Sequence, residues 1–132
     1  MRILGVDYGS KRVGLALSDE QANLAYPHSV VPAAKAKDTI VALCETEGVD
    51  TVVLGESKDY KGNDNLIAPA IKQLAEELKV AALEVIMEPE MLTSAAAERA
   101  GGTHEELDAR AAALILQSYL DRTHRGEWYS TI

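Results

Sequence analysis

MRILGVDYGSKRVGLALSDE, residues 1–20, is the stretch from which the rest of the fold can be worked out. It opens with an apolar run, Ile3 to Val6, that leads Asp7 into a turn containing Gly9. After the turn, a second run over residues 13–18 alternates large and small side chains. Two strand-like runs around a short glycine-containing turn predict a β-hairpin.

Asp7 lies at the end of the first predicted strand, directly after apolar core positions. A carboxylate in such a place is costly to bury unless a partner or a metal ion compensates its charge. An aspartate before a turn can also simply accept hydrogen bonds from the turn backbone. Position alone leaves both roles open for Asp7.

The composition indicates one globular domain covering residues 1–132. Hydrophobic residues make up 47% of the chain, although Phe is absent and aromatic residues are only 5%. The single cysteine, Cys44, excludes an internal disulfide and favours a reducing compartment. No cleavable signal precedes the first strand, and no apolar run approaches the roughly 20 residues that span a bilayer. We therefore expect a cytoplasmic protein that does not contact membranes.

The net charge of −8, from 13 basic and 21 acidic residues, argues against broad electrostatic capture of nucleic acid. The charge is uneven, because residues 1–61 hold 7 basic and 9 acidic side chains whereas residues 62–132 hold 6 and 12. A nucleic-acid surface is therefore expected in the first half of the chain, where metal ions would offset the charge of the carboxylates. Its expected basic residues are Lys11, Arg12, Lys58 and Lys61.

Beyond the hairpin, strands and helices alternate. We expect strands at 24–31, 51–55 and 82–87, and helices at 36–47, 67–79 and 94–100. Pro27 marks the first of these strands as an edge or bulged strand, and Gly48 is a natural cap for the first helix. The last helix begins with the capping box Thr103 to Glu106 and runs to about Arg122. The chain thus predicts an α/β fold with a mixed five-stranded sheet, in which three antiparallel strands precede a parallel βαβ unit and helices flank the sheet.

Asp108 lies at one end of the apolar stripe of the last predicted helix. Its neighbours at helical spacing are Ala111, Ala112, Ile115, Leu116 and Tyr119. A carboxylate on a stripe that faces the sheet needs compensation, which a second acid and a divalent cation would supply. The competing explanation is an acid in the first turn of the helix that the helix dipole stabilises.

Carboxylates also follow the predicted strands, at Asp7, at Glu56, and at Glu88 and Glu90. The carboxyl ends of the strands in a parallel βαβ sheet gather at one edge, so these acids and Asp108 could converge. Two hard cations between oxygen ligands suit phosphodiester hydrolysis, because one activates water and the other stabilises the leaving oxygen. The three histidines lack ligand-like spacing, and no Ser-His-Asp, Cys-His or Walker-type phosphate loop competes.

Residues 5–14, GVDYGSKRVG, resemble the opening signature of the YqgF/RuvX proteins, a branch of the RNase H-like superfamily. Residues 92–94 (LTS), 97–99 (AER), 107–109 (LDA) and 111–120 (AAALILQSYL) resemble that family's later motifs, in the same order and over nearly the whole chain. The resemblance implies an RNase H-like fold, a nuclease site with Mg²⁺ or Mn²⁺, as two ions, and processing of the 5′ end of precursor 16S ribosomal RNA. A Holliday-junction resolvase activity is also attributed to the family.

Carried over by position, the first-strand aspartate of the family is Asp7 and the aspartate of its final helix is Asp108. The family typically has Asp-Glu-Arg before Leu-Thr, whereas residues 89–91 here are Pro-Glu-Met. Glu90 keeps the acid and is the expected third ligand, although the neighbouring acid and the arginine are gone. Glu56 is its rival, since it stands where more distant resolvases place a catalytic glutamate, and Glu88 is a displaced substitute.

The leading hypothesis is a metal-dependent endonuclease acting on structured RNA, with Asp7 bridging the metals, Asp108 ligating one, and Glu90 or Glu56 completing the site. Lys11 and Arg12, beside Asp7, would hold the nucleic-acid backbone, surface solvation being the alternative. The expected partners are precursor ribosomal RNA or branched DNA, and the small ribosomal subunit. The protein itself would be a monomer or a weak homodimer.

Three other functions compete with this hypothesis. Cleavage of DNA junctions would require a dimer able to cut two strands symmetrically. A non-catalytic RNA- or ribosome-binding module is kept open by the altered motif at 89–91. An actin-like ATPase also has an Asp-x-Gly-Ser phosphate loop, but 132 residues are too few for its two-lobed nucleotide cleft.

Overall fold

The computed structural model describes residues 1–56, 67–89 and 104–131, and for 104–108 and 124–131 the backbone alone. Its elements in chain order are β1 (Leu4–Tyr8), β2 (Arg12–Ser18), β3 (Ala25–Pro32), the short 3-10 helix η1 (Ala33–Lys35), α1 (Ala36–Glu47), β4 (Thr51–Glu56), α2 (Ala68–Val80), β5 (Glu84–Pro89) and α4 (His104–Thr131). The predicted hairpin is confirmed. The other predicted strands and the helices at 36–47 and 67–79 are confirmed to within two residues at each end. The helix predicted at 94–100 lies outside the described residues.

The five strands form one mixed sheet in the order β3-β2-β1-β4-β5. The first three strands pair antiparallel, and β1 with β4 and β4 with β5 pair parallel. The predicted mixed sheet with a parallel βαβ unit is therefore confirmed. β3 is an edge strand, and its register with β2 shifts opposite Leu15 and Ala16, next to Pro27. Pro27 thus stands where proline is tolerated in a sheet, as expected.

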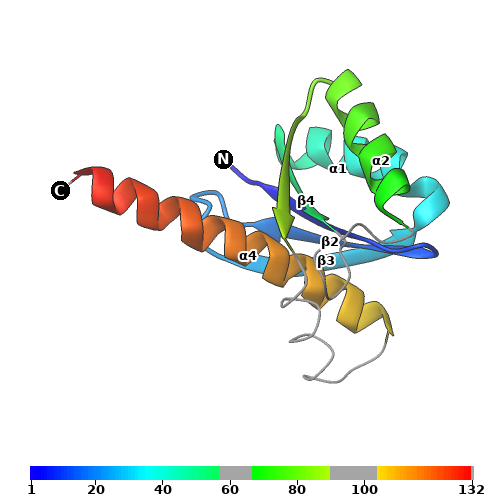
Figure 1. Ribbon diagram of the computed structural model, residues 1–132, viewed down its shortest axis with the longest axis horizontal. Coiled ribbons are helices and arrows are strands. Elements are labelled where there is room, and N and C mark those ends of the chain that lie inside the picture. The colour runs from blue at the N-terminus through cyan, green and yellow to red at the C-terminus, as the bar shows by residue number, and fades with distance from the viewer. Residues whose placement is uncertain (57–66, 90–103, 132) are drawn as a thin grey trace.

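Helices cover both faces of the sheet. α1 and α2 lie on one face, and α4 crosses the other (Figure 1). Because successive side chains of a strand point to opposite faces, Leu4 and Val6 of β1 join the core under α1 and α2. Val53 of β4 instead packs against Ile115 and Leu116 of α4. The apolar stripe predicted beyond Asp108 is buried at 111, 112, 115 and 116.

The predicted end of the last helix at about Arg122 is wrong, because α4 continues to Thr131. The residues after Arg122 contain one poor helix former, Gly126, and no proline. A single glycine costs a helix only about 1 kcal/mol relative to alanine, which is too little to end a helix that is already formed. In the described part of the chain, no helix is both long and apolar enough to cross a bilayer.

Candidate functional site

The parallel strands bring three acidic segments to one edge of the sheet. β1 runs parallel to β4, and β4 runs parallel to β5. Asp7 therefore lies at the same edge as Glu56, which is the last residue of β4 and pairs with Pro89. Glu88 lies at that edge too, one residue before the end of β5. As predicted, the carboxyl ends of these strands lie at one edge of the sheet, which places the backbone of Asp7, Glu56 and Glu88 there.

The two faces of the sheet separate Asp7 from Glu56. Asp7 shares its face with Gly5, which packs directly on α4. Glu56 shares its face with Leu54, which belongs to the core under α1 and α2. Strand alternation therefore directs Asp7 and Glu56 to opposite faces. Both are half-buried, and neither lacks an interaction partner.

Gly5 allows α4 to approach β1 closely. An ideal Cβ at Gly5 would lie 2.7 Å from the Leu116 Cβ and 2.9 Å from the Ala112 carbonyl oxygen. Asp7 follows two residues later on the same face, and Asp108 precedes Ala112 by one helical turn. The sequence analysis uses Gly5 only as part of the 5–14 signature and does not predict this close contact, although a glycine inside a core strand often marks such an approach.

The direction of α4 carries its first turns toward the end of β1 that holds Asp7. Further along α4, the Gln117 amide donates to the Asn23 carbonyl oxygen at 3.1 Å and accepts from the Ala25 N–H at 2.8 Å. Asn23 lies in the connection between β2 and β3, and Ala25 is the first residue of β3, where the end of β2 lies beside the start of β1. The opposite end of α4, with the backbone of Asp108, therefore lies toward the carboxyl end of β1 (Figure 1).

Glu88 is engaged by α4. Its side chain is 5% exposed. The Ser118 hydroxyl donates to its Oε2 at 3.2 Å, and the Arg122 guanidinium pairs with its Oε1. Arg122 also lies 5.6 Å from the centroid of the Tyr119 ring. These contacts compensate the buried carboxylate within the protein and tie the end of β5 to α4.

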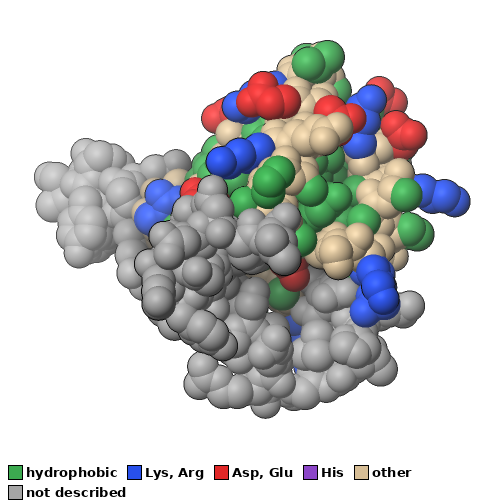
Figure 2. Space-filling view, turned by 45° about the vertical axis from the view of Figure 1, so that its right-hand side comes forward, with side chains coloured by type: hydrophobic (Ala, Val, Ile, Leu, Met, Phe, Trp, Pro, Cys, Tyr) green, Lys and Arg blue, Asp and Glu red, His purple; other side chains and the backbone are tan. Residues whose placement is uncertain are grey.

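Lys11 lies in the turn between β1 and β2, Arg12 is the first residue of β2, and both are exposed. The Gly9 N–H donates to the Arg12 carbonyl oxygen at 2.9 Å, which closes this turn directly beyond Asp7. Figure 2 shows acidic and basic side chains interspersed among the described residues of the face it presents. Lys11 and Arg12 are both exposed and both positively charged, and they follow the end of β1, although the chain as a whole is acidic.

Several expected site residues fall outside the described part of the chain. Glu90, Lys58 and Lys61 lie outside it altogether, and so does the side chain of Asp108. Among the residues whose side chains are described, no three His, Cys, Asp or Glu side chains are grouped to hold a metal ion. The expected metal set thus stays a prediction.

The family model described as "RuvX: Holliday junction resolvase" matches residues 1–122. The chain belongs to the RuvX family. Three curated relatives carry names that propose a pre-16S rRNA nuclease. The relative from Salinibacter ruber is 32% identical, with 92% of this chain and 94% of that protein covered. The relative from Chloroflexus aggregans is 37% identical, covering 90% and 92%, and that from Bacillus cereus is 35% identical, covering 92% and 99%.

Solved structures of resolvases share the fold. The RuvC of T. thermophilus, solved in complex with a Holliday junction substrate, matches with a TM-score of 0.59 at 20% identity, over 93% of this chain and 96% of that chain. The Holliday junction resolvase of fowlpox virus matches with a TM-score of 0.57 at 16% identity, over 92% and 99%. The predicted RNase H-like fold and the predicted family are both confirmed.

Proposed function

We propose that this RuvX-family chain is a divalent-metal-dependent endonuclease that cuts structured RNA at the 5′ end of precursor 16S ribosomal RNA. The observation that carries the proposal is the position of Asp7 on the face of β1 covered by α4, the helix that contains Asp108. The names of the curated relatives support this RNA as substrate. The small ribosomal subunit is then the assembly in which the cut is made.

Asp7, Asp108 and Glu90 are the proposed ligands of two Mg²⁺ or Mn²⁺ ions. Carboxylate oxygens are the donors that such hard cations prefer. Glu56 remains the rival of Glu90, but its place on the face opposite Asp7 favours Glu90. When bound, the ions supply an activated water and stabilise the leaving oxygen.

The other proposed residues of the site bind the substrate or keep the metal ligands in place. Lys11 and Arg12 hold the phosphodiester backbone, so that the scissile phosphate lies at the end of β1. Lys58 and Lys61 are proposed to contact further phosphates of the same nucleic-acid strand. Gly5 keeps α4 against β1, so the acids of strand and helix are preorganised before metal binds.

A second candidate is cleavage of branched DNA, which the description of the matching family favours. The same carboxylates and cations would act on a DNA phosphate. Symmetric cutting of two strands needs two copies of the site, and thus a dimer. A chain that stays monomeric at working concentration would contradict this candidate.

The test is cleavage of a precursor 16S 5′ leader RNA with Mg²⁺ or Mn²⁺, comparing the natural chain with Asp7→Asn. Asp7→Asn should lower the cleavage rate by about a hundredfold or more, because it removes a negative ligand from the reacting centre. Circular dichroism should show an unchanged fold. Asp50→Asn is the matched control, since Asp50 is exposed and precedes β4 at the opposite edge of the sheet.

The outcomes separate the candidates. Full activity in Asp7→Asn would overturn the assignment of the site. Cleavage of a four-way DNA junction, but not of RNA, would support the second candidate. Metal binding without cleavage of either substrate would support a non-catalytic RNA- or ribosome-binding module. Glu56→Gln and Glu90→Gln, measured in the active assay, then identify the third ligand.

A further inference from the structure

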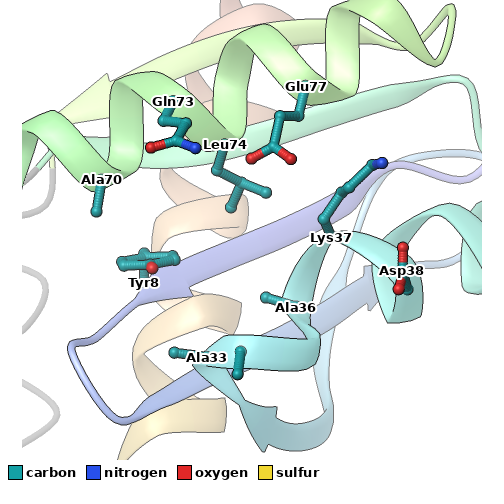
Figure 3. Close-up of a pocket in the computed structure, with 10 residues that line it drawn as sticks. Tyr8, Ala33, Ala36, Lys37, Asp38, Ala70, Gln73, Leu74 and Glu77 are labelled. Atoms are coloured by element: carbon teal, nitrogen blue, oxygen red, sulfur yellow. The ribbon is translucent and has the colours of Figure 1, made fainter.

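A small pocket opens beside the proposed site, on the other face of the sheet. It lies between the end of β1, the start of α1 and the helix α2, and its volume is about 250 Å³. Figure 3 shows the Tyr8 ring beneath α2, with the Gln73 amide above it and Ala33 below it. Pockets that bury drug-sized ligands measure about 300–1,000 Å³, so this one suits a single small ring system.

The pocket and the proposed cutting site share one strand end. Tyr8 directly follows Asp7 in β1, and strand alternation sends their side chains to opposite faces of the same edge. The N–H of Ala33, a pocket residue, donates to the Lys11 carbonyl oxygen at 2.9 Å. The pocket wall is thereby tied to the turn that presents Lys11 and Arg12. A nucleic-acid strand crossing this edge would meet the cations, Asp7 and the pocket together.

The lining fits a planar, uncharged group. Ala33, Ala36 and Ala70 have short side chains, which leaves a slot next to the half-buried Tyr8 ring. An aromatic ring offers a surface on which nucleobases stack. The Gln73 amide carries both a donor and an acceptor, as recognition of a base edge requires.

The charges around the pocket argue against a bound phosphate. Lys37 contributes one positive charge, whereas Asp38 and Glu77 contribute two negative charges. An anion would therefore be repelled, while the uncharged ring of a nucleotide would not be. The phosphates would stay outside, at Lys11 and Arg12.

We propose that this pocket binds one unpaired nucleobase of the substrate, next to the phosphate that is cut. Stacking on Tyr8 and hydrogen bonding to Gln73 would then select a strand whose base is already free of its helix. The proposal rests on the nuclease function proposed above and adds to it a preference for unpaired nucleotides at the cut.

Cleavage of RNAs with a single abasic nucleotide, moved step by step past the cut, tests the proposal. Stacking contributes about 1–3 kcal/mol per base, so kcat/KM should fall on the order of tenfold when the missing base is the one that the pocket binds. Tyr8→Leu and Gln73→Ala should lower kcat/KM on intact RNA and lose this sensitivity, and Tyr8→Phe should keep it. Val80→Ala is the control, because Val80 is exposed at the end of α2, away from the pocket. Equal cleavage of all abasic substrates would overturn the proposal.

A binding measurement separates failure of the pocket from failure of the nuclease assignment. NMR titration with AMP, CMP, GMP and UMP, without metal, should shift the Tyr8 ring and the Gln73 side-chain amide and leave the signals of Val80 in place. These shifts without any RNA cleavage would overturn the nuclease and support the pocket. Cleavage without these shifts would overturn the pocket alone.

Discussion

Gly5 determines how closely the helix with Asp108 approaches the strand with Asp7. An alanine Cβ at this position would lie under 3 Å from both the Leu116 Cβ and the Ala112 carbonyl oxygen, so α4 would have to move away from β1. The backbone oxygen cannot turn aside as a long side chain could. The absence of one side chain thus sets how closely the backbone of α4, the helix that contains Asp108, approaches β1, the strand that contains Asp7.

Gly5→Ala should therefore lower both stability and cleavage. Overpacking of this kind costs about 1–3 kcal/mol in the free energy of unfolding, which urea titration measures. Leu114→Ala is the control, because Leu114 is on α4 but exposed. Unchanged stability and activity in Gly5→Ala would show that α4 tolerates the extra methyl group, contrary to the packing described.

Cys44 provides a pH-dependent part of the stability. Burial, and to a lesser extent the negative charge of Asp50, raise the pKa of the thiol from an ordinary value of 9.0 to about 11. At a pH between 9.0 and about 11, the thiol is mostly deprotonated in the unfolded chain and mostly protonated in the folded chain. The free energy of unfolding should therefore fall as pH rises through this window, by at most about 1.4 kcal/mol per pH unit, and be unaffected below it.

Urea titration of the natural chain and Cys44→Ala from pH 8 to pH 10.5 measures this effect. Other groups titrate in the same range, so the difference between the two proteins is the relevant quantity. The stability advantage of the natural chain should shrink with rising pH. A constant difference would mean that Cys44 ionises equally in both states.

At the scale of elements, α1 and α2 end in the same way with different residues. A residue just beyond each helix has a left-handed backbone: Gly48, one residue after α1, and Ala82, two residues after α2, both with φ 68°. The next N–H donates back into the last turn, from Val49 to the Cys44 carbonyl oxygen at 2.8 Å and from Leu83 to that of Leu78 at 3.1 Å. This is the Schellman arrangement, in which glycine is favoured because it has no Cβ to clash.

Single substitutions at these two positions should have opposite effects on stability. Gly48→Ala should destabilise the chain and Ala82→Gly should stabilise it, each by about 1 kcal/mol, because a left-handed alanine costs about 1–2 kcal/mol and glycine loses somewhat more entropy on folding. Apart from its two chain neighbours, no described residue has a heavy atom within 4 Å of an ideal Cβ at Gly48, so the effect there is conformational rather than steric. Thermal unfolding of the two variants checks it, and the same sign in both would contradict it.

For the molecule as a whole, the sequence predicts what depends on local pattern. Apolar periodicity located the strands and two helices, and the parallel βαβ unit placed Asp7 and Glu56 at one edge. The local pattern could not show that the pocket beside Tyr8 exists, because residues of β1, η1, α1 and α2 form it together. It could not pair Glu88 with Arg122 either, since 34 residues separate them. Helix ends set by small energy differences, as at Arg122, also escape pattern reasoning.

The Glu88–Arg122 pair joins the last strand of the sheet to the helix that crosses the sheet, so its effect belongs to the whole fold. Arg122→Ala would leave the buried Glu88 carboxylate with only the Ser118 hydroxyl among the partners described here. We expect a loss of about 1–3 kcal/mol in the free energy of unfolding. Because the Arg122 side chain is 59% exposed, water screens this ion pair. The loss in the free energy of unfolding should therefore be smaller than for a fully buried pair.

A double-mutant cycle isolates the interaction. Glu88→Gln removes the charge but keeps a group of the same shape, so Arg122→Ala should cost less in that background, and the coupling energy should reach at least about 0.5 kcal/mol. Lys79→Ala is the comparison, because its ion pair with Glu76 at 3.4 Å is exposed on both sides and should change stability by less than about 0.5 kcal/mol. If the effects of Glu88→Gln and Arg122→Ala simply add, the pair does not hold β5 to α4. Among the described residues, the link would then come from the Ser118 hydrogen bond to Glu88 and from the apolar contacts of Ile86 with the α4 core.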